Sequence, residues 1–215
     1  MIGVGEVHVW YVNLKTPTDL TDLLSDDERQ RAARYLHPRP RQQFIAARGS
    51  LRRLLARYTG DDPRAIAFTT TGNGKPCMVS GALLFNVSHS GEGALIALSR
   101  EIEVGVDLEW LRPRESFMDM ARRYFTLQEA EAIGDLRSFY AVWTRKEAFL
   151  KALGLGLAGG LERFAVSHDE PARVLHIDGD TEAGRRWTLV SLEPDQGAVG
   201  AVAFQGVGTL HSFTE

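Results

Sequence analysis

Two acidic side chains alternate along a stretch that reads as a β-strand, Val104-Gly105-Val106-Asp107-Leu108-Glu109. Residues two apart in a strand project from the same face, so Asp107 and Glu109 are expected to lie side by side. Neighbouring carboxylates repel each other unless a cation lies between them. Hard oxygen ligands suit Mg²⁺, which also binds phosphate oxygens. The pair therefore suggests a site for Mg²⁺ and phosphate. The alternative is a strand whose end is exposed to solvent, where acidic residues are also common.

A third acid and two lysines fall on a helix predicted over residues 137–153. Glu147 and Lys151 are four residues apart and share one face at the edge of an apolar stripe. Such a pair is usually a surface ion pair worth only a few tenths of a kcal/mol. Lys146 falls inside the apolar stripe, so either its ammonium reaches solvent past a buried stem or it holds something charged.

A polar strip also follows a buried-looking strand, where Phe85-Asn86-Val87 runs into Ser88-His89-Ser90, with Gly74-Lys75-Pro76 upstream. Such a strand end can present hydroxyl, imidazole and backbone N–H groups to a phosphate. A polar hairpin loop with a surface histidine is the alternative. A serine hydrolase is not expected, because neighbouring strand residues point to opposite faces and no G-x-S-x-G turn is present.

Positive charge is concentrated in residues 29–57, which contain nine arginines and no Asp or Glu. Because the whole chain has a net charge of −3, the remaining residues carry −12. A basic tract on an acidic chain suggests an anionic partner, with a solvated helical face or a nucleic-acid contact as alternatives.

A helix predicted over residues 41–58 divides these arginines by face. Arg53 and Arg57 fall opposite the apolar face and are expected in solvent. Arg48 and Arg52 fall beside it, where a guanidinium loses water and requires a partner. That partner is either a carboxylate of this protein or a phosphate of a ligand.

The elements that position these residues are predicted from the periodicity of the apolar residues and from the residues that cap or interrupt helices and strands. Ser25 with Glu28, and Thr126 with Glu129, are capping boxes that begin helices, and Gly156 keeps the chain flexible after the last helix. Helices are expected at about 25–36, 41–58, 115–124, 127–133 and 137–153. Strands are expected at 6–12, 65–71, 82–88, 94–99, 103–109, 162–168, 172–177, 186–193 and 198–204. The order strand, helices, strands occurs twice and predicts two α+β halves that meet near residues 100–105.

Composition sets outer limits on the function. The chain has 215 residues, of which 44% are hydrophobic, as in an ordinary globular protein. Cys77 is the only cysteine, so neither an internal disulfide nor a cysteine-rich zinc site can form. No apolar run is long enough to cross a bilayer, and the N-terminus lacks a signal-peptide pattern, so a cytoplasmic protein is expected.

Together, in this order and spacing, the polar strips resemble the 4′-phosphopantetheinyl transferases of the larger, pseudo-dimeric, surfactin-synthetase-type class. The arginine helix resembles the coenzyme-binding helix of the same family. The match spans residues 44–157, and the stretches that carry it are FIAARGSLRRLL (44–55), GKP (74–76), FNVSHS (85–90), VGVDLE (104–109) and WTRKEAFLK (143–151).

This resemblance implies two similar α+β halves, residues 1–103 and 104–215, related by a pseudo-twofold axis with the active site at their interface. It implies transfer of 4′-phosphopantetheine from coenzyme A to a serine of an apo acyl or peptidyl carrier protein, releasing adenosine 3′,5′-bisphosphate. The enzyme is expected to be a monomer, with neither nucleic acid nor membrane as a partner.

The resemblance also implies residue roles. Mg²⁺ would be bound by Asp107, Glu109 and Glu147. Coenzyme A would be contacted by Arg48, Arg52, Lys75, Ser88, His89 and Lys151. The residues expected to act in catalysis are His89, Asp107, Glu147 and Lys151. Glu129 falls where some relatives carry another acid near the site, and a helix cap explains it equally well.

For the chemical step, Glu147, or a metal-bound water near it, is hypothesised to accept the serine proton, while Lys151 and His89 face the phosphate oxygens. Lys146 is expected to serve structure by pairing with an acid at the junction of the halves. Two alternatives remain: a nucleic-acid binder that uses the arginine tract, and a coenzyme-binding protein without catalysis.

Overall fold

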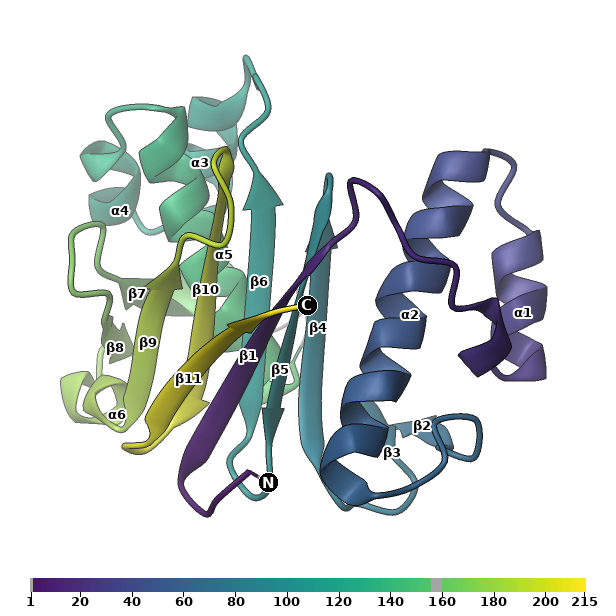
Figure 1. Cartoon of the computed structure of the whole chain (residues 1–215). Coiled ribbons are helices and arrows are strands. Elements are labelled where there is room, and N and C mark those ends of the chain that lie inside the picture. The colour runs from purple at the N-terminus through teal and green to yellow at the C-terminus, as the bar shows by residue number, and fades with distance from the viewer. Residues whose placement is uncertain (1, 156–159) are drawn as a thin grey trace.

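A computed structural model describes residues 2–155 and 160–215, which form the mixed α+β fold expected from the sequence (Figure 1). Gly156, expected to be flexible, and residue 157 at the end of the matched stretch lie outside the described residues. Within the described ranges, no helix combines the length and the apolar character that crossing a membrane requires.

The first sheet has the strand order β11-β1-β5-β4. Its strands β1, β5 and β4 pair antiparallel, whereas β11 runs parallel to β1 at the edge. The four strands are β1 (Glu6–Asn13), β4 (Leu84–Ser90), β5 (Gly93–Ser99) and β11 (Thr209–Thr214). The strand β11 was not predicted, and it brings the end of the chain into the sheet formed by residues 6–99. The division at residue 103 remains a prediction.

The helix α2 (Pro38–Thr59) packs on this sheet, and α1 (Asp26–Ala33) lies on the far side of α2 (Figure 1). The predicted capping box of Ser25 and Glu28 is confirmed, although α1 ends three residues before the expected Leu36. Pro38 and Pro40 do not separate the helices as expected; they lie in the first turn of α2. A proline is favourable there because its missing N–H would have no partner within the helix.

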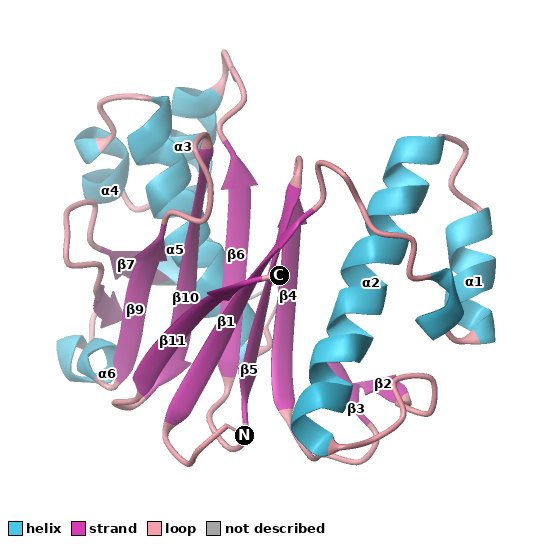
Figure 2. Cartoon of the chain, in the orientation of Figure 1, coloured by secondary structure: helices cyan, strands magenta, loops and turns pink. Residues whose placement is uncertain are grey.

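The second sheet has the order β6-β10-β9, and the long helix α5 packs on it (Figure 2). Thr126 and Glu129 form the predicted capping box of α4. The sheet strands are β6 (Val104–Trp110), β9 (Trp187–Leu192) and β10 (Ala198–Gln205). The helices of this part are α3 (Phe117–Tyr124), α4 (Leu127–Ala132), α5 (Leu136–Leu153) and α6 (Thr181–Arg185).

Two short hairpins complete the fold. In the first, β2 pairs with the unpredicted β3 around the expected turn at Gly72–Gly74, and β3 begins at Pro76, directly after Lys75. The hairpin strands are β2 (Phe68–Thr70), β3 (Pro76–Met78), β7 (Phe164–Val166) and β8 (Val174–Ile177).

Alternating side chains of β1 explain how the two sheets are layered. Trp10 and Val12 pack in a core with α2, whereas Val7, Val9 and Tyr11 pack in a second core against β6 and β10. The two sheets therefore lie face to face between α2 and α5. This arrangement brings the edge strands β4 and β6 alongside each other.

Candidate active site

Three polar side chains on one face of β4 join the two sheets. Asn86, Ser88 and Ser90 occupy alternate positions, so all three point toward β6. Their side-chain oxygens accept hydrogen bonds from backbone N–H groups of β6 at 2.9, 3.3 and 3.1 Å; the donors are Val106, Leu108 and Trp110. We call this the β4–β6 seam. The seam holds the polar end of β4 against the acidic strand.

Asp107 lies on β6 at the centre of the seam and is 5% exposed. Its Oδ1 accepts hydrogen bonds from Lys151 Nζ at 2.6 Å and from the Ser88 hydroxyl at 2.8 Å. Lys151 Nζ also donates to Ser88 Oγ at 3.0 Å. The expected carboxylate, hydroxyl and ammonium groups are thus brought together by β4, β6 and α5.

Gly105 allows α5 to approach β6 closely enough for these contacts. A Cβ atom at this position would lie 2.1 Å from the Ala148 carbonyl oxygen and 2.2 Å from the Ala152 nitrogen. These distances are far below van der Waals contact, so any side chain at residue 105 would push the helix outward. Glu147 and Lys151 lie on the part of α5 that would move.

Glu147 and Glu109 lie in the electric field of Asp107. Burial, followed by the negative charges of Asp107 and Glu109, raises the pKa of Glu147 to about 7 despite the opposing charge of Lys151. Burial and the charge of Asp107 also raise the pKa of Glu109, whose Oε2 accepts a hydrogen bond from the Ser90 hydroxyl at 2.9 Å. The three acids are therefore electrostatically coupled.

Two carboxylate oxygens in this cluster are buried and lack a hydrogen-bond partner within the described residues, Asp107 Oδ2 and Glu147 Oε1. Unpaired buried carboxylate oxygens are costly, and a divalent cation is a ligand that would satisfy them. In the same described ranges, ligand oxygens of Asp107, Glu109 and Glu147 do not all lie within 4.8 Å of one another. The chemistry of the donor set fits Mg²⁺, and the predicted ligation remains a prediction.

His89 and Arg48 face a common pocket, which also includes Gln43, Phe44 and Val87 and has a volume of about 220 Å³. The His89 side chain remains exposed, yet surrounding protein atoms and the charge of Lys151 lower its pKa. A neutral imidazole is therefore favoured there at neutral pH. The pocket lies between α2 and the end of β4.

Both arginines beside the apolar face of α2 pair with Glu28 of α1. Arg52 Nε donates to Glu28 Oε2 at 2.7 Å, and Arg48 Nε donates to Glu28 Oε1. Arg52 is 1% exposed, and it also donates to the carbonyl oxygens of Pro63 and Ile66. Of the two alternatives predicted from sequence, the carboxylate partner is present for both side chains. Arg48 also lines the pocket of His89.

Lys75 lies at the C-terminal end of α5. Its Nζ donates to Glu103 Oε2 at 2.6 Å, to the Val104 carbonyl oxygen at 3.1 Å and to the Ala152 carbonyl oxygen at 3.5 Å. The lysine thus ties the β2–β3 hairpin to β6 and to the last turn of the helix. Its expected contact with coenzyme A remains a prediction.

The structural role expected for Lys146 is confirmed. Its Nζ is buried and donates to both oxygens of Glu129, at 2.8 and 2.7 Å, and to the Phe164 carbonyl oxygen. Glu129 also accepts hydrogen bonds from the N–H groups of Thr126 and Val166. The expected location was wrong, because this ion pair joins α5, α4 and β7 and does not lie at the junction of the halves.

Several positioning residues were missed from sequence. Asn86 and Ser90 stood in the polar strip, and their period-two spacing with Ser88 was the available signal. Glu28 was assigned only as a helix cap, although it is an acid that directly precedes the arginine tract. Gly105 gave no local signal, because its role depends on a helix more than forty residues away. Arg53 and Arg57 are exposed, as expected.

Comparison with known families gives two matches that together span most of the chain. Residues 9–101 match the family model described as "4'-phosphopantetheinyl transferase, N-terminal". Residues 103–203 match the model described as "4'-phosphopantetheinyl transferase superfamily". The first match contains α2 and β4, and the second contains β6 and α5. The seam therefore lies where the two matched regions meet.

Individual proteins similar to this chain are also named as 4′-phosphopantetheinyl transferases. The 4′-phosphopantetheinyl transferase HetI of Nostoc sp. is 38% identical over 97% of this chain and 91% of its own length. The putative 4′-phosphopantetheinyl transferase slr0495 of Synechocystis sp. is 39% identical over 82% of this chain and 75% of its own. A 4′-phosphopantetheinyl transferase of Bacillus subtilis is 29% identical over 66% of both chains.

These matches place the chain among group-transfer enzymes. The chain belongs to the 4′-phosphopantetheinyl transferase superfamily and is a 4′-phosphopantetheinyl transferase.

Proposed function

We propose that this enzyme transfers 4′-phosphopantetheine from coenzyme A to a serine of an apo acyl or peptidyl carrier protein and releases adenosine 3′,5′-bisphosphate. The observation that carries the proposal is the cluster of Asp107, Ser88 and Lys151 at the seam, with Glu147 beside it. The cluster combines acids that suit a cation with an ammonium that suits a phosphate, which transfer of a phosphate ester requires.

We further propose that the enzyme is of the surfactin-synthetase type, with two halves related by a pseudo-twofold axis. In support, a long helix packs on the outer face of each sheet, α2 on the first and α5 on the second. Ser88 from one half and Asp107 from the other meet within one chain, which supports a monomer. Gel filtration and cell fractionation test the monomeric state and the cytoplasmic location.

Asp107, Glu109 and Glu147 would hold Mg²⁺, and the unpaired oxygens of Asp107 and Glu147 support their assignment as ligands. When bound, the ion would neutralise charge on the pyrophosphate. Lys151 already contacts Asp107, and its ammonium is suited to a phosphate oxygen. The Ser88 hydroxyl contacts both the Lys151 ammonium and the Asp107 carboxylate and so fixes their relative positions.

Arg48 and His89 would bind another part of coenzyme A. Their pocket of about 220 Å³ is smaller than the roughly 300–1,000 Å³ of sites that enclose a drug-sized ligand. It would therefore take only part of the coenzyme, and the guanidinium would meet a phosphate there. Arg52 is a positioning residue in this proposal, because it holds Glu28 and so orients Arg48. Lys75 would contact the coenzyme from the β2–β3 hairpin.

Glu147 would act as the proton acceptor. The serine O–H bond breaks as the new O–P bond forms, the P–O bond of the pyrophosphate breaks, and the proton passes to the Glu147 carboxylate. Without a bound cation, burial and the neighbouring acids raise the pKa of Glu147 to about 7, which makes its carboxylate a stronger base than a free one; Mg²⁺ bound at the same carboxylate would lower that pKa. The leaving adenosine 3′,5′-bisphosphate takes the bonding electron pair.

The proposal is tested by mass spectrometry of an apo carrier protein after incubation with the enzyme, coenzyme A and Mg²⁺. The expected result is a mass gain of one phosphopantetheine group on the carrier serine. Glu147→Gln should abolish the gain while coenzyme A binding, measured by calorimetry, persists. An unchanged carrier mass with several apo carriers would contradict the proposed function, and an active Glu147→Gln enzyme would contradict the assigned base.

A further inference from the structure

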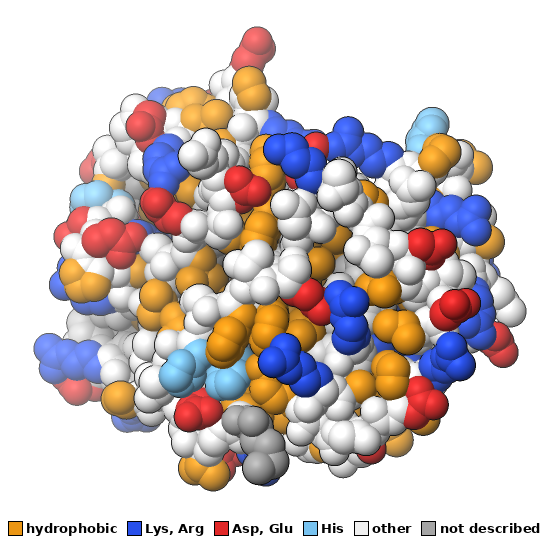
Figure 3. Space-filling model, viewed as in Figure 1, with side chains coloured by type: hydrophobic (Ala, Val, Ile, Leu, Met, Phe, Trp, Pro, Cys, Tyr) orange, Lys and Arg blue, Asp and Glu red, His pale blue; other side chains and the backbone are white. Residues whose placement is uncertain are grey.

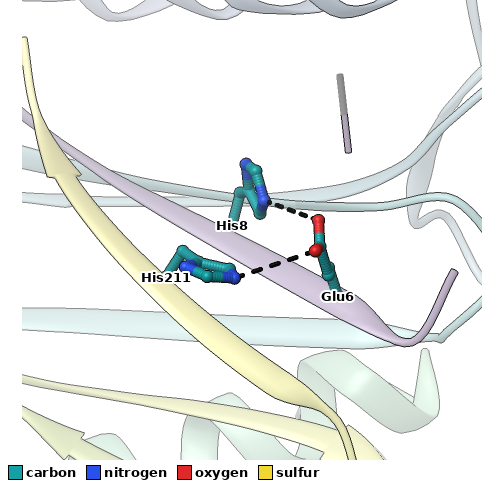
Figure 4. Close-up of side chains that lie close together, drawn as sticks. All are labelled: Glu6, His8 and His211. Carbon is teal, nitrogen blue, oxygen red and sulfur yellow. Dashed lines mark hydrogen bonds and ion pairs between the residues drawn. The ribbon is translucent and has the colours of Figure 1, made fainter. Parts of the chain in front are cut away.

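A second group of ligand-type side chains lies away from the seam, on β1 and β11. Glu6, His8 and His211 are close together, with ligand atoms all within 4.8 Å of one another (Figure 4). In the sheet order β11-β1-β5-β4, these strands form the edge opposite to β4. Nothing in the transfer reaction uses them.

The strand register brings these three side chains together. His8 is directly paired with His211 in the parallel ladder between β1 and β11. Glu6 precedes His8 by two residues and therefore projects from the same face. Two ligands from one strand and a third from its neighbour are thus positioned by backbone hydrogen bonds, with no loop involved.

The distances suit a single ion between the three groups. His8 Nε2 lies 3.2 Å from Glu6 Oε2, and His211 Nε2 lies 3.9 Å from Glu6 Oε1. Two atoms bound to one zinc ion at about 2.0–2.1 Å and tetrahedral angles lie roughly 3.3 Å apart. Small side-chain rotations of the half-exposed His211 would close the remaining gap.

Outer contacts orient two of the three ligands. His8 Nδ1 lies 2.7 Å from the Tyr58 hydroxyl, which also accepts a hydrogen bond from Trp10 Nε1 at 3.0 Å. This contact points His8 Nε2 toward the other two groups. Glu6 Oε2 accepts a hydrogen bond from the Gly3 N–H at 2.6 Å. Metal-binding histidines and carboxylates in proteins are typically held by such partners.

We propose that Glu6, His8 and His211 form a binding site for a zinc-class divalent ion that clasps β11 to β1. Two imidazoles and one carboxylate suit Zn²⁺ or Co²⁺, whereas Mg²⁺ prefers oxygen ligands. The side chain of His8 is 10% exposed, but those of Glu6 and His211 are 33% and 43% exposed. One side of the site is therefore open to a water as fourth ligand. Figure 3 shows histidine and acidic side chains together on this surface.

The test is titration of the chelator-treated full chain with Co²⁺ in millimolar Mg²⁺, which would occupy the acidic site proposed at the seam. One equivalent of Co²⁺ should bind and give the visible ligand-field absorption of a four- or five-coordinate ion. His211→Ala should weaken binding by more than about 100-fold, and Tyr58→Phe by about 10–100-fold. His168→Ala, which removes another exposed histidine, is the matched control and should bind normally.

Hydrogen exchange provides a second readout that does not depend on catalysis. Co²⁺ should slow amide exchange in residues 209–214 of the wild-type chain and leave it unchanged in His211→Ala. The inference is overturned if Co²⁺ fails to bind in the presence of Mg²⁺, or if His211→Ala binds as tightly as the wild-type chain. Loss of Co²⁺ binding in Glu109→Gln, with His211→Ala unaffected, would also overturn it by assigning the ion to the seam.

Discussion

Lys151 Nζ lies 2.6 Å from Asp107 Oδ1, and the Ser88 hydroxyl, from the other sheet, contacts both groups. The lysine neutralises one oxygen of the buried carboxylate and leaves Oδ2 unpaired among the described residues. Asp107 can therefore keep its ion pair while its second oxygen binds another ligand. Lys151 is therefore part of the polar cluster at the seam through contacts within the protein alone.

Replacing Lys151 by Ala should lower kcat for carrier-protein modification by about 10²–10³, the usual cost of removing one preorganised donor to a developing charge. Steady-state kinetics with an apo carrier protein measures this change. Arg185→Ala is the matched control, because Arg185 is exposed on α6, which packs on β8 and β9, and its loss is expected to leave kcat unaltered. Equal rates for the two variants would remove Lys151 from the catalytic set.

Replacing Gly105 by Ala should destabilise the fold and the site together. The added methyl would lie 2.1 Å from the Ala148 carbonyl oxygen, so α5 must move away from β6. Overpacking typically costs about 1–3 kcal/mol, and contact with rigid helix backbone should place this variant at the upper end. Urea unfolding measures the loss. Gly134→Ala, whose methyl would meet nothing within 4 Å, should change the unfolding free energy by less than about 0.5 kcal/mol.

Breaking the buried pair of Lys146 and Glu129 should cost more. Lys146→Met leaves an uncompensated carboxylate whose side chain is 3% exposed, so the free energy of unfolding should fall by about 3–5 kcal/mol. Adding Glu129→Gln removes that charge and keeps an acceptor for one of the two N–H groups of Thr126 and Val166, which donate to different oxygens of Glu129, so it should recover part of the loss. If Lys146→Met were fully stable but inactive, Lys146 would belong to the active site.

Local signals in the sequence predicted most of the elements around the site. The alternation of Asp107 and Glu109, the four-residue spacing of Glu147 and Lys151, and two capping boxes depend only on residues close in the chain. These features are confirmed in the structure. Some element boundaries differ from the prediction. The helix α2 was expected from residue 41, because proline usually breaks a helix, but it begins at Pro38, where proline is favourable in the first turn.

Contacts between segments far apart in the chain could not be predicted from these local signals. The strand β11 was missed, although it alternates weakly, because its partner β1 lies about two hundred residues earlier. Both arginine partners were left open for the same reason, since only the packing of α1 on α2 brings Glu28 to Arg48 and Arg52. The strand and helix positions of the candidate residues were therefore predictable from the sequence, whereas the contacts that orient them required the fold.

Titration of Glu147 should make the stability of the protein depend on pH. The pKa of Glu147 is raised from 4.5 to about 7, so between these values the folded chain retains a proton that the unfolded chain releases. Its contribution to the free energy of unfolding should therefore fall as pH rises from about 4.5 to 7 and level off above. At about 1.4 kcal/mol per unit, the metal-free protein should lose about 3 kcal/mol across this window.

The measurement is urea unfolding of the wild-type protein and of Glu147→Gln at several pH values, with a chelator present. The difference between their free energies of unfolding, plotted against pH, gives the contribution of Glu147. The substituted side chain cannot titrate, so its profile should lack the loss. Saturating Mg²⁺ should flatten the wild-type slope, because a bound cation favours the deprotonated carboxylate. Parallel profiles for the two proteins would mean that Glu147 of the metal-free chain does not hold a proton near neutral pH, which would contradict this prediction.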